Sequence, residues 1–202
     1  MRVNKYPWWK MPYIVWCLVL TKVLFPRARF VRMPIDIRCR KYMHIGHSLT
    51  TGRCCRIECG PEKRALGEYK LFIGNNVQFN DYVHISAWNK VVIGDDVLLA
   101  SKIYISDVSH GCFGDKIPYE IELPPIKQPL NMSEVVIGNN TWIGESVSIL
   151  PGVHIGRCCI IGANSLVNKD IPDYCIAAGI PAKIIKTFNL ETKKWQQVKR
   201  IK

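Results

Sequence analysis

A histidine stands where a repeating pattern in the sequence is interrupted. His110 lies near the end of the stretch ISDVSHG, Ile105 to Gly111, and residues 111–136 lack the pattern. A histidine can take a proton from a hydroxyl group at neutral pH, which makes that oxygen able to attack an activated acyl group. A histidine in a turn can also simply bond a neighbouring backbone group. Its position at the start of a long excursion, which could build one wall of a site, makes general-base catalysis a candidate role.

The pattern on both sides of this break is a repeat of six residues. The units read IGNNVQ FNDYVH ISAWNK from Ile73, IGDDVL LASKIY ISDVSH from Ile93, and continue for six more from Ile137. No α-helix repeats at six, whereas three short strands and their turns form a coil of about 18 residues. We therefore predict an all-β solenoid, a parallel β-helix, whose leading Ile and Val residues stack in its interior. Gly and Asn are expected at turns that need unusual backbone angles.

Three segments follow from this pattern. Residues 1–44 form a basic, apolar segment with an expected helix in PYIVWCLVLTKVLFP, whose apolar run is shorter than the roughly 20 residues that cross a membrane. That helix either lies at a membrane surface or packs on the protein or a second subunit. Residues 45–187 form the solenoid, with the excursion at 111–136. Residues 188–202 form a short helix or a basic tail.

The net charge of +12 belongs to the two ends of the chain. Residues 1–44 contain ten Lys and Arg residues against one acidic residue, and residues 183–202 contain seven against one. An anionic membrane, a phosphate-bearing cofactor or nucleic acid could bind such ends, and we favour the first two. The nine cysteines show no CxxC spacing and no secretory signal is apparent, so we expect reduced thiols in a cytoplasmic protein.

These residues resemble the hexapeptide-repeat acyltransferase superfamily. FNDYVHI, SDVSHG and AAGIPAKIIK are similar to its sugar and lipopolysaccharide O-acetyltransferase branch. The resemblance implies a left-handed β-helix, a homotrimer and acetyl-CoA as acyl donor. It also implies acetylation of a saccharide hydroxyl, on a free or lipid-linked precursor of a surface polysaccharide, in the cytoplasm or at the inner membrane face.

The same resemblance assigns candidate site residues. His110 matches the family's catalytic base, and Asn80 matches an asparagine that helps to bind the acceptor. Further acceptor-site candidates are Asp81, where some relatives have an aromatic residue, His84, and Asp107, for which a turn-capping role is favoured. Candidates for the coenzyme A groove share the later coils and the C-terminal motif: Trp142, Gly144, Ala163, Ser165, Lys169, Lys183 and, with less support, Lys186.

Two alternative functions stay open, and a third, metal-dependent function is disfavoured. One is an acetyltransferase for small molecules such as antibiotics or free sugars, and another is a solenoid that only binds a partner. A γ-class carbonic anhydrase has the same solenoid with three histidine ligands, two of them five residues apart. Here the second of those positions is Asp115, so we expect no metal and interpret His84 and His154 as turn or subunit-interface residues.

Overall fold

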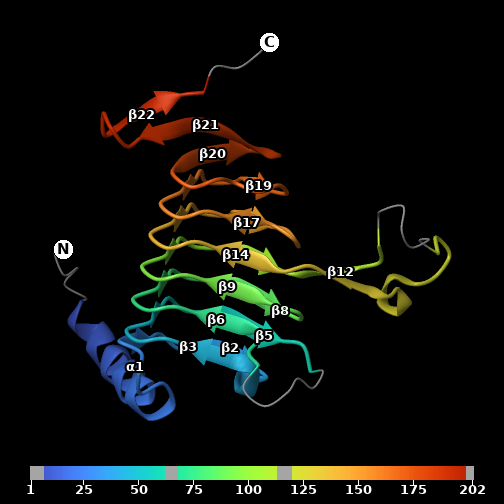
Figure 1. The fold of residues 1–202 in the computed structure, drawn as a ribbon. Helices are drawn as coiled ribbons and strands as arrows, with labels where there is room; N and C mark the ends of the chain where they lie inside the picture. Colours follow the sequence, from blue (N-terminus) through green and yellow to red (C-terminus); the bar gives the residue numbers. More distant parts are fainter. Residues whose placement is uncertain (1–6, 62–67, 113–119, 199–202) are drawn as a thin grey trace.

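A computed structural model describes residues 7–61, 68–112 and 120–198, and its body is a parallel β-helix with three faces (Figure 1). Each face is one sheet. Sheet A contains β1 (Phe30–Val31), β4 (Thr50–Thr51), β7 (Gln78–Phe79), β10 (Leu98–Leu99), β15 (Trp142–Ile143), β18 (Ile160–Ile161), β20 (Cys175–Gly179), β21 (Ala182–Asn189) and β22 (Lys194–Gln197). Sheet B contains β2 (Ile35–Arg38), β5 (Cys55–Cys59), β8 (His84–Ala87), β11 (Tyr104–Ser106), β16 (Ser148–Ile149) and β19 (Leu166–Val167). Sheet C contains β3 (Met43–Ile45), β6 (Leu71–Ile73), β9 (Val91–Ile93), β14 (Val135–Ile137) and β17 (His154–Ile155).

The first residues of the hexads form the core, as the period predicts. Ile73, Ile93 and Ile137 are aligned on successive strands of sheet C and are fully buried. Ile85, Ile105 and Ile149 form the equivalent column in sheet B. Apolar side chains from all three sheets thus enter the triangular interior, two of them from a strand such as β6 (Leu71 and Ile73), so each coil is stabilised mainly by the coils above and below it.

The corner that joins sheet C to sheet A, the C–A corner, explains the recurring Gly-Asn pair. The N–H of His47 donates to Oδ1 of Asn75, and the N–H of Asn75 donates to Oδ1 of Asp95 one coil further on. The residue after this ladder has a left-handed backbone, with φ of 54° at Asn76, a conformation that Asn tolerates well. Glycine is needed at position 46 for lack of space and not for an unusual backbone angle, because a Cβ there would lie 2.5 Å from the carbonyl oxygen of Gly74. The expectation of unusual angles is therefore wrong for this hexad glycine.

The N-terminal helix covers the first coil. After η1 (Trp8–Lys10), α1 (Met11–Leu24) packs against β1. The buried Thr21 hydroxyl accepts a hydrogen bond from the N–H of Val31 at 2.9 Å and donates to the carbonyl of Cys17 at 2.7 Å. The helix thereby satisfies part of an edge strand that has no preceding coil. Within the described residues, no helix has the length and apolar character needed to cross a bilayer.

The solenoid begins earlier and ends differently than expected. Its first coil starts at Phe30 instead of residue 45, and the repeat does not reveal this because neither β1 nor β2 is followed by glycine or contains an Ile-Gly pair. Near the other end, the expected helix or tail from residue 188 is an antiparallel hairpin of β21 and β22, as far as residue 198. Phe188 and Trp195 face each other across it with ring centroids 5.1 Å apart, and this cross-strand aromatic pair favours strands over a helix.

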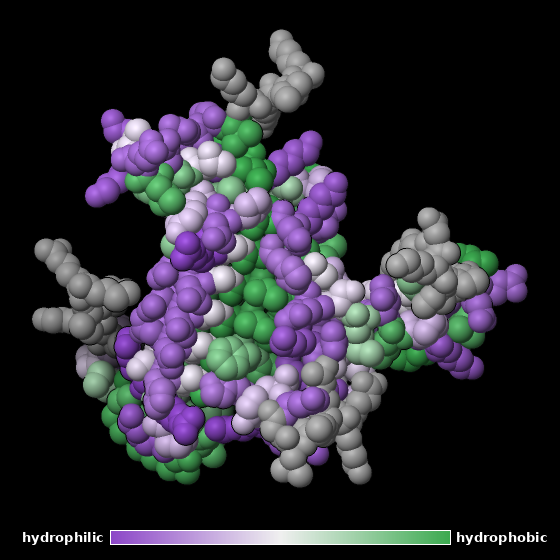
Figure 2. All heavy atoms as spheres, viewed as in Figure 1, coloured by the Kyte–Doolittle hydropathy of each residue, from purple (hydrophilic) through white to green (hydrophobic). Residues whose placement is uncertain are grey.

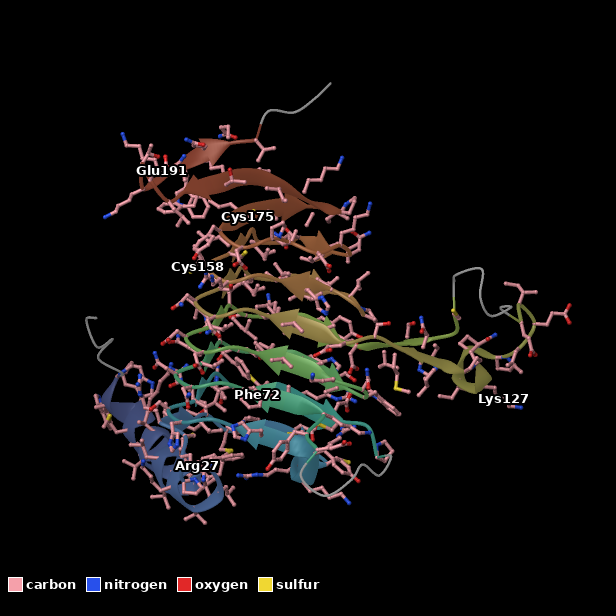
Figure 3. The ribbon with its side chains drawn as sticks, viewed as in Figure 1. Arg27, Phe72, Lys127, Cys158, Cys175 and Glu191 are labelled. Atoms are coloured by element: carbon pink, nitrogen blue, oxygen red, sulfur yellow. The ribbon has the colours of Figure 1, made fainter. Side chains whose placement is uncertain are left out.

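A two-stranded arm leaves the solenoid between sheets B and C (Figure 1). The arm consists of β12 (Val108–His110), β13 (Leu130–Met132) and the segment between them, which contains η3 (Pro125–Lys127). Lys127 lies far out on it, away from Phe72 on sheet C (Figure 3). The predicted excursion at 111–136 therefore has an ordered base, while residues 113–119 lie outside the described part.

Candidate active site

His110 lies at the base of the arm. It is the last residue of β12, where it is paired with Leu130 of β13, and the N–H of Gly111 donates to the carbonyl of Pro129 at 2.8 Å. The side chain of His110 is exposed. The antiparallel base therefore fixes the backbone while it leaves the imidazole accessible to a substrate, which is the arrangement that a general base needs.

Asp107 anchors the break in the repeat. Its carboxylate is fully buried and accepts hydrogen bonds from the backbone N–H groups of Trp88, Asn89 and Lys90 at 2.6–2.8 Å. Burial raises the pKa of Asp107, and those three hydrogen bonds oppose the rise. Its carbonyl also accepts from the N–H of Ser133, where the chain returns from the arm. The carboxylate is directed at the turn of residues 88–90, so the structure gives Asp107 a turn-holding role instead of contact with an acceptor.

Asn80 and Asp81 lie at a different corner from His110. They follow β7 at the corner that joins sheet A to sheet B, the A–B corner. Oδ1 of Asp81 accepts from the N–H of Arg53 at 2.8 Å, and Oδ1 of Asn80 lies 3.4 Å from Nε2 of Gln78. His110 follows β11 and lies past the carboxyl ends of the strands of sheet B. Within one chain, the two predicted acceptor residues therefore lie before the strands of sheet B, and the predicted base lies after them.

A charged network on sheet B involves His84. Nε2 of His84 lies 3.3 Å from Glu58, whose other carboxylate oxygen accepts from Arg56 at 2.7 Å. Burial alone would raise the pKa of Glu58, but the hydrogen bonds from Arg56 and His84 outweigh it and keep that pKa below its ordinary value. The ring of Tyr104 lies 5.3 Å from that of His84. Sequence reasoning missed Arg56, Glu58 and Tyr104, and only the alternating charges of the RIE stretch hinted at the first two.

Replacing Glu58 by Gln should remove a pH-dependent part of the stability. Because the pKa of Glu58 is lower in the folded than in the unfolded chain, its contribution is present above about pH 4.5 and is lost as pH falls through the folded-state pKa. Wild type should exceed Glu58→Gln by about 1 kcal/mol in unfolding free energy at neutral pH, and by less at a pH well below 4.5. Urea unfolding at both pH values measures this. Glu145→Gln, at an exposed ion pair with Lys102, should show no such change, and a constant Glu58→Gln deficit would contradict the prediction.

The candidates for the coenzyme A groove divide into two groups. Trp142 lies on sheet A, aligned between Leu98 and Ile160, with nearly half of its surface exposed. Gly144 and Ala163 occupy the A–B corner on successive coils, and a Cβ on Gly144 would lie 2.6 Å from the N of Ala163. These three residues line one edge of sheet A, where a pantetheine arm could follow the backbone.

The remaining candidates are Ser165 and two lysines. Ser165 is buried, and its hydroxyl donates to the carbonyl of Gly162 and accepts from the N–H of Gly179, so it has a structural role. Lys169 follows β19 at the end of sheet B, and Lys183 is exposed on β21. Lys183 is paired with Ala178 of β20, so it lies in the same sheet as Trp142 and on the side of Gly144, two strands further along the solenoid than β18.

Metal ligands do not cluster in the part of the chain that the structure describes: no three His, Cys, Asp or Glu residues come together as a cation would need. His84 is bonded to Glu58, and His154 lies on sheet C. Asp115 lies outside the described residues.

Comparison with known proteins finds hexapeptide-repeat transferases. Residues 134–169 match the family described as bacterial transferase hexapeptide (six repeats). The chain is 41% identical over 181 residues, 89% of each chain, to a protein of Escherichia coli K12 described as a putative lipopolysaccharide biosynthesis O-acetyl transferase, WbbJ. It is 39% identical over 119 residues to the galactoside O-acetyltransferase of the same organism, covering 59% of this chain and 55% of that one.

Solved structures show the same fold. A galactoside acetyltransferase in complex with coenzyme A has a TM-score of 0.51 at 28% identity, with 82% of this chain and 72% of that chain covered. A variant of AntD, an N-acyltransferase from Bacillus cereus, has a TM-score of 0.67 at 18% identity over 87% and 90% of the two chains. These likenesses confirm the predicted left-handed parallel β-helix.

Proposed function

This chain belongs to the hexapeptide-repeat acyltransferases, and we propose that it transfers the acetyl group of acetyl-CoA to a hydroxyl group of a saccharide. The acceptor is a precursor of lipopolysaccharide or another surface polysaccharide. The observation that carries the proposal is the position of His110, exposed at the paired base of the arm, in a chain 41% identical to a protein described as a putative lipopolysaccharide biosynthesis O-acetyl transferase.

The chemistry follows from that position. Nε2 or Nδ1 of His110 takes the proton of the acceptor hydroxyl while the hydroxyl oxygen attacks the thioester carbonyl carbon. A backbone N–H on a rigid turn stabilises the negative charge that develops on the carbonyl oxygen. The C–S bond then breaks, and the imidazolium returns the proton to the departing thiolate. No covalent enzyme intermediate is required, because the thioester is already activated.

The complete site requires more than one subunit. His110 lies at one corner of the solenoid, whereas Asn80 and Trp142 lie on and beside sheet A. A homotrimer would place one subunit's A–B corner against the next subunit's arm. Apolar side chains on the outer faces support such contacts: Phe72, Val92 and Val136 are aligned on sheet C, where a hydrophobic band runs between two hydrophilic ones (Figure 2). On sheet A, Leu98, Trp142 and Ile160 form a second apolar column.

Release of free thiol from acetyl-CoA in the presence of a pool of saccharides tests the activity. Acceptor-dependent release supports the transferase. The same assay with antibiotics and free sugars separates the small-molecule alternative, which predicts a preference for those acceptors. Absence of saturable coenzyme A binding would contradict both acetyltransferase functions and would favour a solenoid that only binds a partner.

We also propose that α1 contacts the inner face of the membrane. The exposed surface of η1 and α1 is largely apolar, and its large apolar residues are Trp8, Trp9, Met11, Val15, Trp16, Leu18, Val19, Val23 and Leu24. Lys10, Lys22 and Arg27 border it, and this mixture of aromatic, aliphatic and cationic residues suits an anionic lipid interface. The nine cysteines are free thiols, which agrees with a reducing cytoplasm.

Two glutamates on α1 should detach the protein from vesicles. Val19→Glu/Val23→Glu introduces charge on side chains that are 56% and 71% exposed, so folding should be unaffected. We expect vesicles with anionic lipid to sediment at least about tenfold less of this variant than of wild type. Ile121→Glu, an 84% exposed apolar residue on the arm, is the matched control and should sediment normally. Equal sedimentation of all three proteins would contradict membrane contact through α1.

A further inference from the structure

A cationic cavity lies between the start of α1 and the A–B corner. It has a volume of about 230 Å³ and is lined by Lys10, Tyr13, Ile14, Arg32, Arg53 and Asp81. We call it the corner cavity. Arg53 and Asp81 follow β4 and β7 at equivalent places on successive coils, and Arg32 follows β1 on the coil below. Three coils and the N-terminal helical segment therefore meet around one space.

The charges of the corner cavity favour an anion with several oxygen atoms. Lys10, Arg32 and Arg53 supply three cations, and among the described residues Asp81 is the one acidic residue lining it. Oδ1 of Asp81 already accepts from the backbone N–H of Arg53, which partly compensates that carboxylate. The Tyr13 hydroxyl donates to the carbonyl of Met33 at 2.6 Å and so fixes the helix against this corner. Two guanidinium groups and one ammonium group are the usual partners of phosphate oxygens.

The neighbours of the corner cavity indicate what the anion belongs to. On one side, Asn80 directly precedes Asp81 and is the proposed acceptor-binding residue. On the other side, α1 exposes the apolar surface described above. A phosphate group here would therefore lie between a saccharide and a lipid surface.

We infer that the corner cavity binds the diphosphate of a glycosyl diphosphate acceptor and so presents its sugar to Asn80. This inference rests on the proposed function, since it names the class of acceptor for that reaction. A lipid-linked diphosphate would extend its hydrocarbon chain along α1, whereas a nucleotide-linked one would extend into solvent. Both share the diphosphate, and the experiment below distinguishes them.

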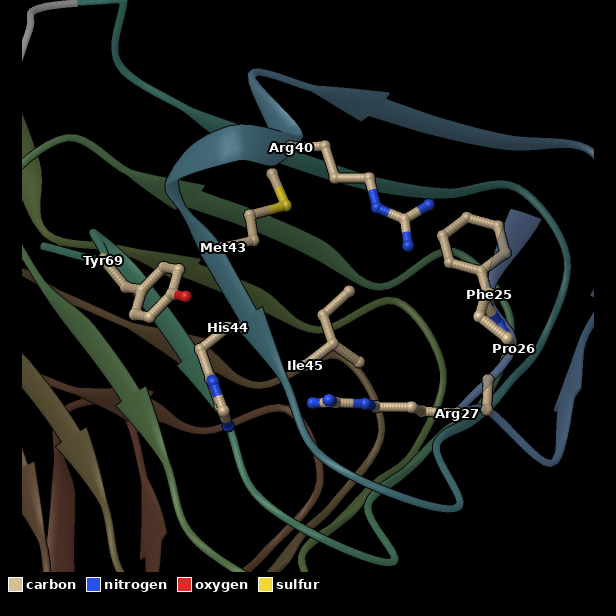
Figure 4. Close-up of a pocket in the computed structure, with 9 residues that line it drawn as sticks. Phe25, Pro26, Arg27, Arg40, Met43, His44, Ile45 and Tyr69 are labelled. Carbon is tan, nitrogen blue, oxygen red and sulfur yellow. The ribbon is translucent and has the colours of Figure 1, made fainter. Parts of the chain in front are cut away.

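A second cationic cavity provides the control (Figure 4). It has a volume of about 240 Å³ and lies at the other end of α1 against β3, where Arg27, Arg40 and His44 line it together with apolar residues. Arg40 is already engaged, because its guanidinium bonds the carbonyl of Leu24 and lies 4.4 Å from the centre of the Phe25 ring. This cavity borders the same helix but belongs to sheet C, away from the turn of Asn80.

Calorimetric titration with inorganic pyrophosphate tests the site on the full chain saturated with coenzyme A, so that the donor's own phosphate contacts are filled. Wild type should bind pyrophosphate, and Arg53→Gln and Lys10→Gln should each raise its Kd by at least about tenfold. Arg27→Gln, which removes the same charge at the second cavity, should change it by less than about twofold. Equal weakening in all three variants, or no binding by wild type, would overturn the inference.

Kinetics with three acceptors separate the sources. The acceptors are three forms of the same saccharide: the free saccharide, the saccharide linked to a nucleoside diphosphate, and the saccharide linked to a polyprenyl diphosphate in neutral vesicles. Arg53→Gln should raise KM for the diphosphate acceptors with kcat unchanged and leave the free saccharide unaffected; an equal rise for all three overturns the inference. A further rise in Val19→Glu/Val23→Glu for the polyprenyl acceptor alone identifies the lipid source. Pyrophosphate binding without any acetyl transfer would contradict the proposed function but retain the anion site, and the reverse would contradict the site alone.

Discussion

Replacing His110 by Ala is expected to reduce acceptor-dependent thiol release by a factor of about 10²–10⁴, the usual contribution of a general base. The side chain is exposed and the paired backbone of β12 and β13 does not depend on it, so the fold should persist. Coenzyme A binding should be unchanged, because Trp142 lies on sheet A and Gly144 and Ala163 lie at the A–B corner, away from His110 in the same chain. Steady-state kinetics together with a coenzyme A titration measure both quantities.

The matched control is His47→Ala, which removes an exposed histidine at the C–A corner. It should retain wild-type activity. If His110→Ala kept its full rate as well, His110 would be only a turn residue and another base would have to be sought. A loss of coenzyme A binding along with activity would indicate a structural role for this histidine.

Mixing two inactive variants should restore activity if each site is shared between subunits. Asn80→Ala lacks the proposed acceptor-binding residue and His110→Ala lacks the proposed base, so neither variant alone should form a complete site in the proposed homotrimer. In randomly mixed trimers, about a quarter of the interfaces join an intact His110 to an intact Asn80, and activity should rise to about a quarter of that of wild type. Subunits are mixed by co-expression or by joint refolding, and the rate is compared with that of each variant alone.

The recovery of activity distinguishes a site shared between two subunits from a site formed within one subunit. Activity no higher than the sum of the two variants would mean that Asn80 and His110 act from the same subunit, across sheet B. A mixture of Asn80→Ala with an Asn80→Ala/His110→Ala double variant is the control and should stay inactive. The double variant shares the trimer contacts of the others but can complete no site.

Local and repetitive features were predictable from the sequence. A period of six with apolar leading residues determines a three-sided coil, since each strand is too short to be stable except against its equivalents on the next coil. The long departure from that period predicted the arm and singled out His110, whereas Asn80 and Trp142 became candidates through the resemblance to the family. Each of these conclusions depends on residues that are close together in the chain or equivalent in the repeat.

Features that depend on contacts between distant residues were decided only by the tertiary structure. The first coil lacks the glycine pattern and is recognisable only because β1 and β2 pair with later strands. The C-terminal hairpin depends on pairing that the cationic, helix-like spacing of its sequence conceals. Asp107 could have faced His110, but burial directed it to the N–H groups of residues 88–90. The corner cavity gathers Lys10, Arg32 and Arg53 from separate elements, and no sequence period relates a helix to the coil corners against which it packs.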